Sequence, residues 1–198
     1  MKKIIILFII ISSCKKEVYY YPSKSFFEEN KPKEINIDNL NFQQVTDSIS
    51  NGLFRNERYF MTLNDSKSII MLSPIAYTGG YIKEKNILEI DDDSLWFGAK
   101  KVSIKELSKH IKLHYENNGK IAYLPDSYKR AFLQLNLETE DSSDKLKGRL
   151  LNIIKVYYST NFKCKDSVNL EIMLNYYLDK VYPQPILPPP PIPLEIED

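Results

Sequence analysis

Residues 86–119, NILEIDDDSLWFGAKKVSIKELSKHIKLHYENNG, carry the clearest local signals of fold in this chain. The run 86–90 is rich in β-prone apolar residues, and the run Leu-Trp-Phe at 95–97 follows after the turn-forming Asp-Asp-Asp-Ser of 91–94. Short β-prone runs on either side of such a turn are typical of a hairpin. The sequence therefore predicts two adjacent antiparallel strands here.

The second half of this stretch predicts an amphipathic helix. Ser103 and Glu106 have the spacing of a capping box, in which each side chain accepts a hydrogen bond from the backbone N–H of the other residue. Apolar residues recur on one helical face from Ile104 to Tyr115, and the Asn-Asn-Gly at 117–119 is a typical helix end.

Further elements are predicted on the N-terminal side of this stretch. Phe42, Val45 and Ile49 recur at helical spacing, which indicates a short helix over 40–50. The β-rich runs 58–63 and 68–72 flank turn residues and predict a second hairpin.

The C-terminal side predicts two strands and two helices. The strands are 121–124 and the alternating run 133–137, which we expect to be half-buried. Turn and cap residues at 141–144 predict a helix after them, and Ser167 is placed to cap a last one. The fold class expected is therefore a single α+β domain over 36–182, with a mainly antiparallel sheet and three to four helices.

The N-terminus has the three parts of a secretory signal. Lys2 and Lys3 precede the apolar run 4–11, and Ile11-Ser12-Ser13-Cys14 resembles a bacterial lipobox. The apolar run is too short for a transmembrane helix, which needs about 20 residues. We expect cleavage after residue 13, acylation of Cys14 with chains such as palmitate, and a tether over residues 14–35.

The C-terminal segment 183–198 is rich in proline and ends in acidic residues. Proline at this density excludes helix and sheet pairing, so an extended polyproline II segment is predicted. Pro185, Pro188 and Pro191 have PxxP spacing, which suits aromatic grooves on partner proteins. A simple spacer and a partner-binding segment both remain open.

Composition excludes several classes of protein. The formal net charge is +1 and no basic stripe is present, so nucleic acid is not an expected partner.

The chain has two cysteines, and acylation of Cys14 leaves Cys164 without a disulfide partner. Cys164 lies between two lysines that could lower its pKa, but base rates for free cysteine favour the role of a small buried apolar residue. We expect no cofactor.

His110 and His114 come nearest to a metal site, being four residues apart on the predicted helix, with Asp126 as the nearest third ligand. They lack the Glu of the metalloprotease motif and lie at the edge of the apolar face, so we expect no metal.

Two other patterns favour structural roles. Ser142-Ser143-Asp144-Lys145 contains Ser-x-x-Lys, but its partner motifs are missing and helix capping explains it. The acidic run 91–93 lacks the spacing of a Ca²⁺ loop and suits a turn.

Residues 86–162 resemble the periplasmic domain of the ExbD/TolR biopolymer-transport family. The resemblance rests on the runs 87–90, 95–97 and 101–107, with 133–139 and 145–158 as a second strand and helix. It implies a shared fold. It does not imply a proton-linked role, because the apolar run 4–11 has no acidic residue.

These patterns together predict a lipid-anchored binding or scaffolding protein of the cell envelope, without enzyme activity. We expect it on the periplasmic face of the outer membrane, in contact with the membrane through its lipid and with an envelope protein complex. The alternative is an envelope hydrolase that uses His110, His114 or Cys164.

Overall fold

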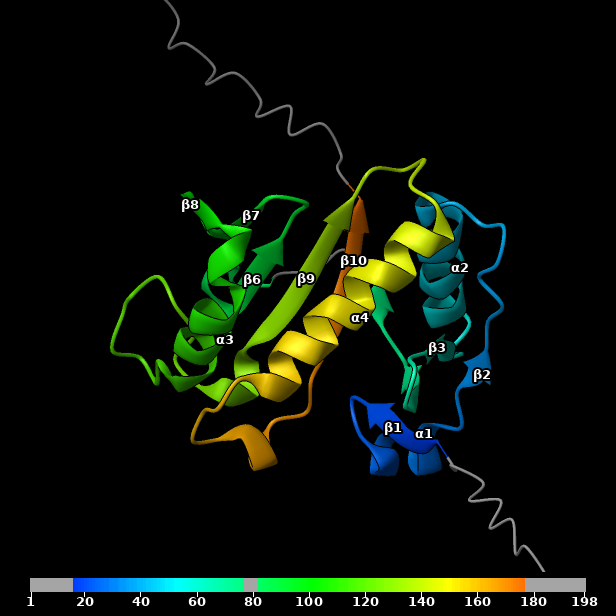
Figure 1. Ribbon diagram of the computed structural model, residues 1–198, viewed down its shortest axis with the longest axis horizontal. Helices are drawn as coiled ribbons and strands as arrows, with labels where there is room; N and C mark the ends of the chain where they lie inside the picture. The colour runs from blue at the N-terminus through cyan, green and yellow to red at the C-terminus, as the bar shows by residue number, and fades with distance from the viewer. Residues whose placement is uncertain (1–15, 77–81, 177–198) are drawn as a thin grey trace, which may run out of the picture.

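Two β-sheets and the helices around them make up the part of the chain that the computed structural model describes, residues 16–76 and 82–176 (Figure 1). The smaller sheet has the strand order β1-β4-β3-β2, with the bounds Glu17–Tyr21, Ser68–Leu72, Tyr59–Asn64 and Lys33–Glu34. The larger sheet has the order β5-β10-β9-β6-β7-β8, with the bounds Ile75–Ala76, Ile172–Tyr176, Phe132–Leu137, Ile87–Ile90, Ser94–Phe97 and Lys100–Ser103. The α-helices are α1 (Lys24–Asn30), α2 (Phe42–Phe54), α3 (Leu107–Glu116) and α4 (Ser143–Ser159). The short 3₁₀ helices are η1 (Glu84–Asn86), η2 (Ile104–Glu106), η3 (Tyr128–Arg130) and η4 (Lys165–Ser167).

The α+β class is confirmed, but both sheets are mixed rather than mainly antiparallel. In the smaller sheet β3 and β4 are antiparallel, while β1 and β2 are parallel to their neighbours. In the larger sheet β5, β10, β9 and β6 are mutually parallel, and only the β6–β7–β8 meander is antiparallel. Parallel neighbours need a long crossover, usually a helix. The helix α4 is that crossover between β9 and β10.

One hydrophobic core joins the larger sheet, its helices and the buried side chains of the smaller sheet. Figure 1 shows α3 and α4 across one face of this sheet. The helix α2 contacts β5 and β10. Residues on alternate positions of the central strands are almost fully buried, among them Leu88, Ile90, Leu133, Leu135, Ile172 and Leu174.

The central strand β9 is buried on both faces, so the prediction of a half-buried strand is wrong. Gln134 and Asn136 are only 5% and 4% exposed. Gln134 donates to Asn136 at 2.8 Å, and Asn136 donates to the carboxylates of Glu89 and Asp91 at 3.0 and 2.9 Å. Buried polar groups are tolerated when they are hydrogen-bonded in this way.

The expected tether over residues 14–35 is also wrong for most of its length. Residues 17–34 form β1, α1 and β2, and β1 pairs along its whole length with β4. Ser23 caps α1 by accepting a hydrogen bond from the N–H of Phe26 at 3.1 Å. The folded domain thus begins three residues after Cys14, and not near residue 35.

A capping box is present, but not where the sequence predicted it. Ser103 accepts from the N–H of Lys105 at 3.3 Å and so caps η2, whereas Glu106 bonds to Lys109. The reciprocal pair is instead Asn41 and Gln44 at the start of α2, with hydrogen bonds of 2.9 and 3.0 Å. A polar residue followed three positions later by Gln is an equally valid signature.

Two predicted elements after α3 are wrong. Residues 121–124 form turns rather than a strand, because the Asn117 side chain holds this segment. Its amide NH₂ donates to the carbonyls of Ile121 and Pro125, and its amide oxygen accepts from the N–H of Ile121. The helix expected after Ser167 is the strand β10, which inserts between β5 and β9.

The remaining local predictions are confirmed. The hairpins β3–β4 and β6–β7 form as expected, and α2, α3 and α4 lie where their apolar spacing placed them. The helix α2 extends four residues beyond the predicted end.

The predicted signal 1–13, Cys14 and the proline-rich segment 183–198 lie outside the described residues. Within the described ranges, no helix has the length and apolar character needed to cross a bilayer.

Candidate functional site

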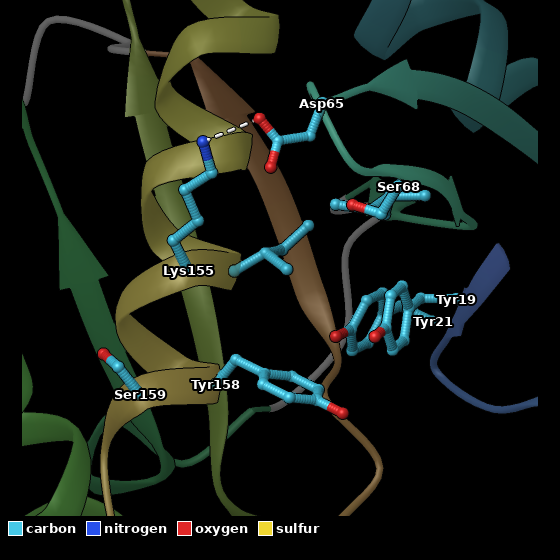
Figure 2. A pocket seen from close by; sticks show the side chains of 9 residues that line it. Tyr19, Tyr21, Asp65, Ser68, Lys155, Tyr158 and Ser159 are labelled. Atoms are coloured by element: carbon cyan, nitrogen blue, oxygen red, sulfur yellow. Dashed lines mark hydrogen bonds and ion pairs between the residues drawn. The ribbon is translucent and has the colours of Figure 1, made fainter. Parts of the chain in front are cut away.

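A cleft of about 300 Å³ lies between the strands β1 and β4 and the C-terminal half of α4 (Figure 2). Tyr19 and Tyr21 of β1 line it on one side, and Tyr158 of α4 points toward them from the other. Ile70 of β4 and Ile154 of α4 complete its apolar lining. We call this site the aromatic cleft.

Strand and helix periodicity explain why these side chains meet. Successive side chains of a strand alternate between its faces, so Tyr19 and Tyr21 lie on the same face of β1. The parallel pairing places Tyr19 opposite Ile70 of β4. Ile154 and Tyr158 are four residues apart and therefore lie on one side of α4.

The cleft has a buried floor and a more open aromatic wall. Tyr21, Ile70 and Ile154 are at most 8% exposed, whereas Tyr158 is 54% exposed. The rings of Tyr19 and Tyr158 meet edge to face, with their centroids 5.5 Å apart. An edge-to-face pair leaves ring faces available for a further apolar group.

The Tyr19 and Tyr21 hydroxyls stay protonated at neutral pH. Tyr19 donates its hydroxyl to the Glu17 carboxylate at 2.5 Å, and this hydrogen bond raises the pKa of Tyr19 to about 12. Burial raises the pKa of Tyr21 further above its usual range. These groups are therefore hydrogen-bond donors and not nucleophiles.

Lysines surround the cleft. Lys155 forms an ion pair with Asp65 at 2.9 Å, and this hydrogen bond lowers the pKa of Asp65. Lys16 donates to the backbone carbonyl of Asp65 at 3.1 Å. The ammonium of Lys165 lies 5.0 Å from the centroid of the Tyr158 ring, a cation–π geometry.

The two histidines of α3 face the core. His114 is fully buried, its Nε2 lies 3.2 Å from the carbonyl oxygen of Phe132, and burial lowers its pKa to about 4. His110 packs against the Phe97 ring, and burial lowers its pKa too. Asp126, the third ligand considered, is paired with Lys85 at 2.7 Å. Within the described ranges, no three His, Cys, Asp or Glu residues are grouped so that they could hold a metal ion.

Cys164 lacks the environment of an activated thiol. Its thiol donates to the carbonyl oxygen of Tyr115 at 3.4 Å, and the side chain is half-buried. Burial raises the pKa of the thiol, so the expected effect of the two flanking lysines is not observed. A thiol with a raised pKa is a poor nucleophile at neutral pH.

Ser142 and the acidic run 91–93 have the structural roles that the sequence favoured. Ser142 caps α4 by accepting from the N–H of Lys145 at 3.3 Å. Asp91 accepts from the Trp96 indole at 2.6 Å, and Asp92 pairs with Lys145 at 2.7 Å, which closes the hairpin turn against α4.

Sequence reasoning missed the aromatic cleft. Its walls come from β1, β4 and α4, which are distant in sequence, and β1 was assigned to a tether. The available signal was the Tyr-Tyr-Tyr run at 19–21, a composition typical of strands.

Comparison of the chain with protein-family models, with curated proteins and with solved structures gives no match.

Proposed function

We propose that this protein is a lipid-anchored, non-enzymatic binding or scaffolding module of the cell envelope, held through Cys14 on the periplasmic face of the outer membrane. The observation that carries the proposal is the position of the aromatic cleft. Lys16, two residues after Cys14, bonds to the cleft residue Asp65. Acylation at Cys14 would therefore hold the aromatic cleft next to the membrane.

The state of the reactive side chains supports binding over hydrolysis. An enzymatic nucleophile needs a lowered pKa or an adjacent base. The pKa of the Cys164 thiol is raised, while His114 is enclosed in the core and bonded to a backbone carbonyl. Neither histidine nor Cys164 lines the aromatic cleft.

We also propose that residues 86–162 share the fold of the ExbD/TolR periplasmic domain. The order of elements supports this: the β6–β7–β8 meander is followed by α3, then by β9 and α4. The proposal concerns the fold alone and carries no proton-linked activity.

The anchoring and the binding role are tested together in the native envelope. Wild-type protein and Cys14→Ala are expressed at equal levels, crosslinked in intact cells, extracted with detergent and purified. We expect the wild type to fractionate with outer membranes and to yield a reproducible set of crosslinked envelope proteins. Cys14→Ala should lose both.

A third variant, Cys164→Ser, separates the two candidate functions. A scaffold retains its crosslinked partners in this variant, because Cys164 does not line the aromatic cleft. Recovery of the wild-type protein in the soluble fraction, without partners, would refute the proposal. Loss of a hydrolytic activity in Cys164→Ser would favour the hydrolase.

A further inference from the structure

We propose that the aromatic cleft is a docking site for a proline-rich segment, and that its occupant is the segment Pro183–Pro193 of the same chain. This inference concerns the chain by itself and holds whether or not Cys14 is acylated. It assigns the cleft and the proline-rich segment to each other as binding partners.

The chemistry of the cleft suits a polyproline II segment. Such segments have no internal hydrogen bonds and bind in grooves lined by aromatic rings. Tyr19 and Tyr158 supply two rings above a floor formed by Tyr21, Ile70 and Ile154. Proline rings pack on aromatic faces, and the exposed backbone carbonyls of the segment can accept hydrogen bonds from donors around the cleft.

The proline spacing matches the size of the aromatic wall. Polyproline II has three residues per turn, so in that conformation Pro185, Pro188 and Pro191 would share one edge, with neighbours about 9 Å apart. The Tyr19 and Tyr158 centroids are 5.5 Å apart. Two successive prolines on this edge can therefore flank the tyrosine pair.

The segment is long enough to reach the cleft within one molecule. The last described residue, Tyr176, pairs with Leu137, and α4 begins six residues after Leu137. The cleft residues 154–159 therefore lie about 17–24 Å along the α4 axis from this end of the sheet, at 1.5 Å per residue. From residue 176 to Pro191, an extended polyproline chain covers about 45 Å.

Charge complementarity favours the same occupant. Glu195, Glu197 and Asp198 follow the prolines. Lys155 and Lys165 lie beside the cleft, and Lys16 bonds to its rim. Prolines seated on the tyrosines would bring the acidic residues within range of these ammonium groups.

A tethered occupant competes with outside ligands for the cleft. Flexible linkers give effective concentrations on the order of 1 mM. If the free segment binds with a dissociation constant of about 0.1 mM, the tethered one then occupies the cleft about nine-tenths of the time. An outside proline-rich ligand would bind the intact chain about tenfold more weakly than a chain without the segment.

The test uses a fluorescein-labelled peptide of residues 183–198 and fluorescence anisotropy. The receptors are the full-length protein in detergent and the same protein lacking residues 183–198, with thermal melts to confirm that both are folded. We expect saturable binding to the shortened protein and about tenfold weaker binding to the full-length one.

Matched variants of the shortened protein locate the site. Tyr158→Ala should abolish binding, whereas Tyr123→Ala should not change it. Tyr123 is a suitable control because it is also exposed, at 45%, and also carries a lysine over its ring. A peptide with alanine at positions 185, 188 and 191 should not bind.

Three results would overturn the proposal. They are a peptide that does not bind the shortened protein, a peptide that binds Tyr158→Ala as well as it binds Tyr123→Ala, and equal binding to both chain lengths. The full-length protein could bind the peptide weakly only at high protein concentration, with a dimer seen by light scattering. That result would assign the occupant to a second copy instead.

Discussion

Protonation of the buried His114 should make this domain sensitive to mildly acidic pH. The ring is enclosed by the core, its Nε2–H donates to the Phe132 carbonyl at 3.2 Å, and burial holds the pKa near 4. An unfolded histidine has a pKa of about 6.5. The unfolded chain therefore takes up a proton before the folded one does, and stability falls as the pH is lowered.

The size of this effect follows from the two pKa values. The contribution is fully present above about pH 6.5 and is lost progressively toward pH 4. Between pH 7 and pH 5 the free energy of unfolding should fall by about 2 kcal/mol from this residue alone. At a urea m value of about 2 kcal/mol/M, the unfolding midpoint moves by about 1 M.

Urea denaturation of wild type and His114→Gln at pH 7, 6 and 5 measures this difference. The variant keeps an amide that can donate to the Phe132 carbonyl, and its general loss of stability cancels when the pH dependence of each protein is compared. We expect the wild-type midpoint to fall about 1 M more than that of the variant. His110→Gln is the control, with a smaller effect expected because the Glu106 carboxylate lies 3.6 Å from its Nε2. Parallel pH dependence in wild type and His114→Gln would refute the argument.

Three further predictions concern the anchor, the N-terminal strand and the helix caps. Mass spectrometry of the mature wild-type protein should find an acylated Cys14, and an unmodified thiol there would contradict the lipobox. Tyr21→Ala should lower the free energy of unfolding by about 3 kcal/mol, because the ring is buried; no loss would mean that β1 contributes nothing. Asn41→Ala should cost about 1 kcal/mol and Ser103→Ala less, since the latter caps only a 3₁₀ turn; denaturation showing the reverse order would contradict the assignment of the caps.

Much of the fold was predictable because its signals are local. The turn residues of the β6–β7 hairpin and the apolar spacing on α4 act within one element, so sequence alone identifies both. Their prediction required no knowledge of neighbouring strands.

The strand β10 shows where local reasoning fails. Leu170, Met173 and Leu174 have helical spacing, but Leu170, Ile172 and Leu174 also alternate as in a strand. Both sets of residues are almost fully buried. No exposed polar face therefore favours the helical pattern over the strand pattern. The choice is made by β5 and β9, which pair with this segment from far away in the sequence.

The candidate site was missed for the same physical reason. Tyr19, Ile70 and Tyr158 come from three separate segments, and only the β1–β4 pairing together with the position of α4 brings them together. The histidines and Cys164, by contrast, attracted attention as residue types. Their buried environments, which sequence does not reveal, favour structural roles.

The position of β10 also constrains the order in which the domain can form during synthesis. The smaller sheet is complete once Leu72 has been made, because all four of its strands precede that point. The larger sheet must wait for residues 172–176, which fill the place between β5 and β9. Until then β9 presents an unpaired edge, and bare edges promote association between chains. A nascent or truncated chain ending before Ile172 is therefore the form of this protein most exposed to aggregation.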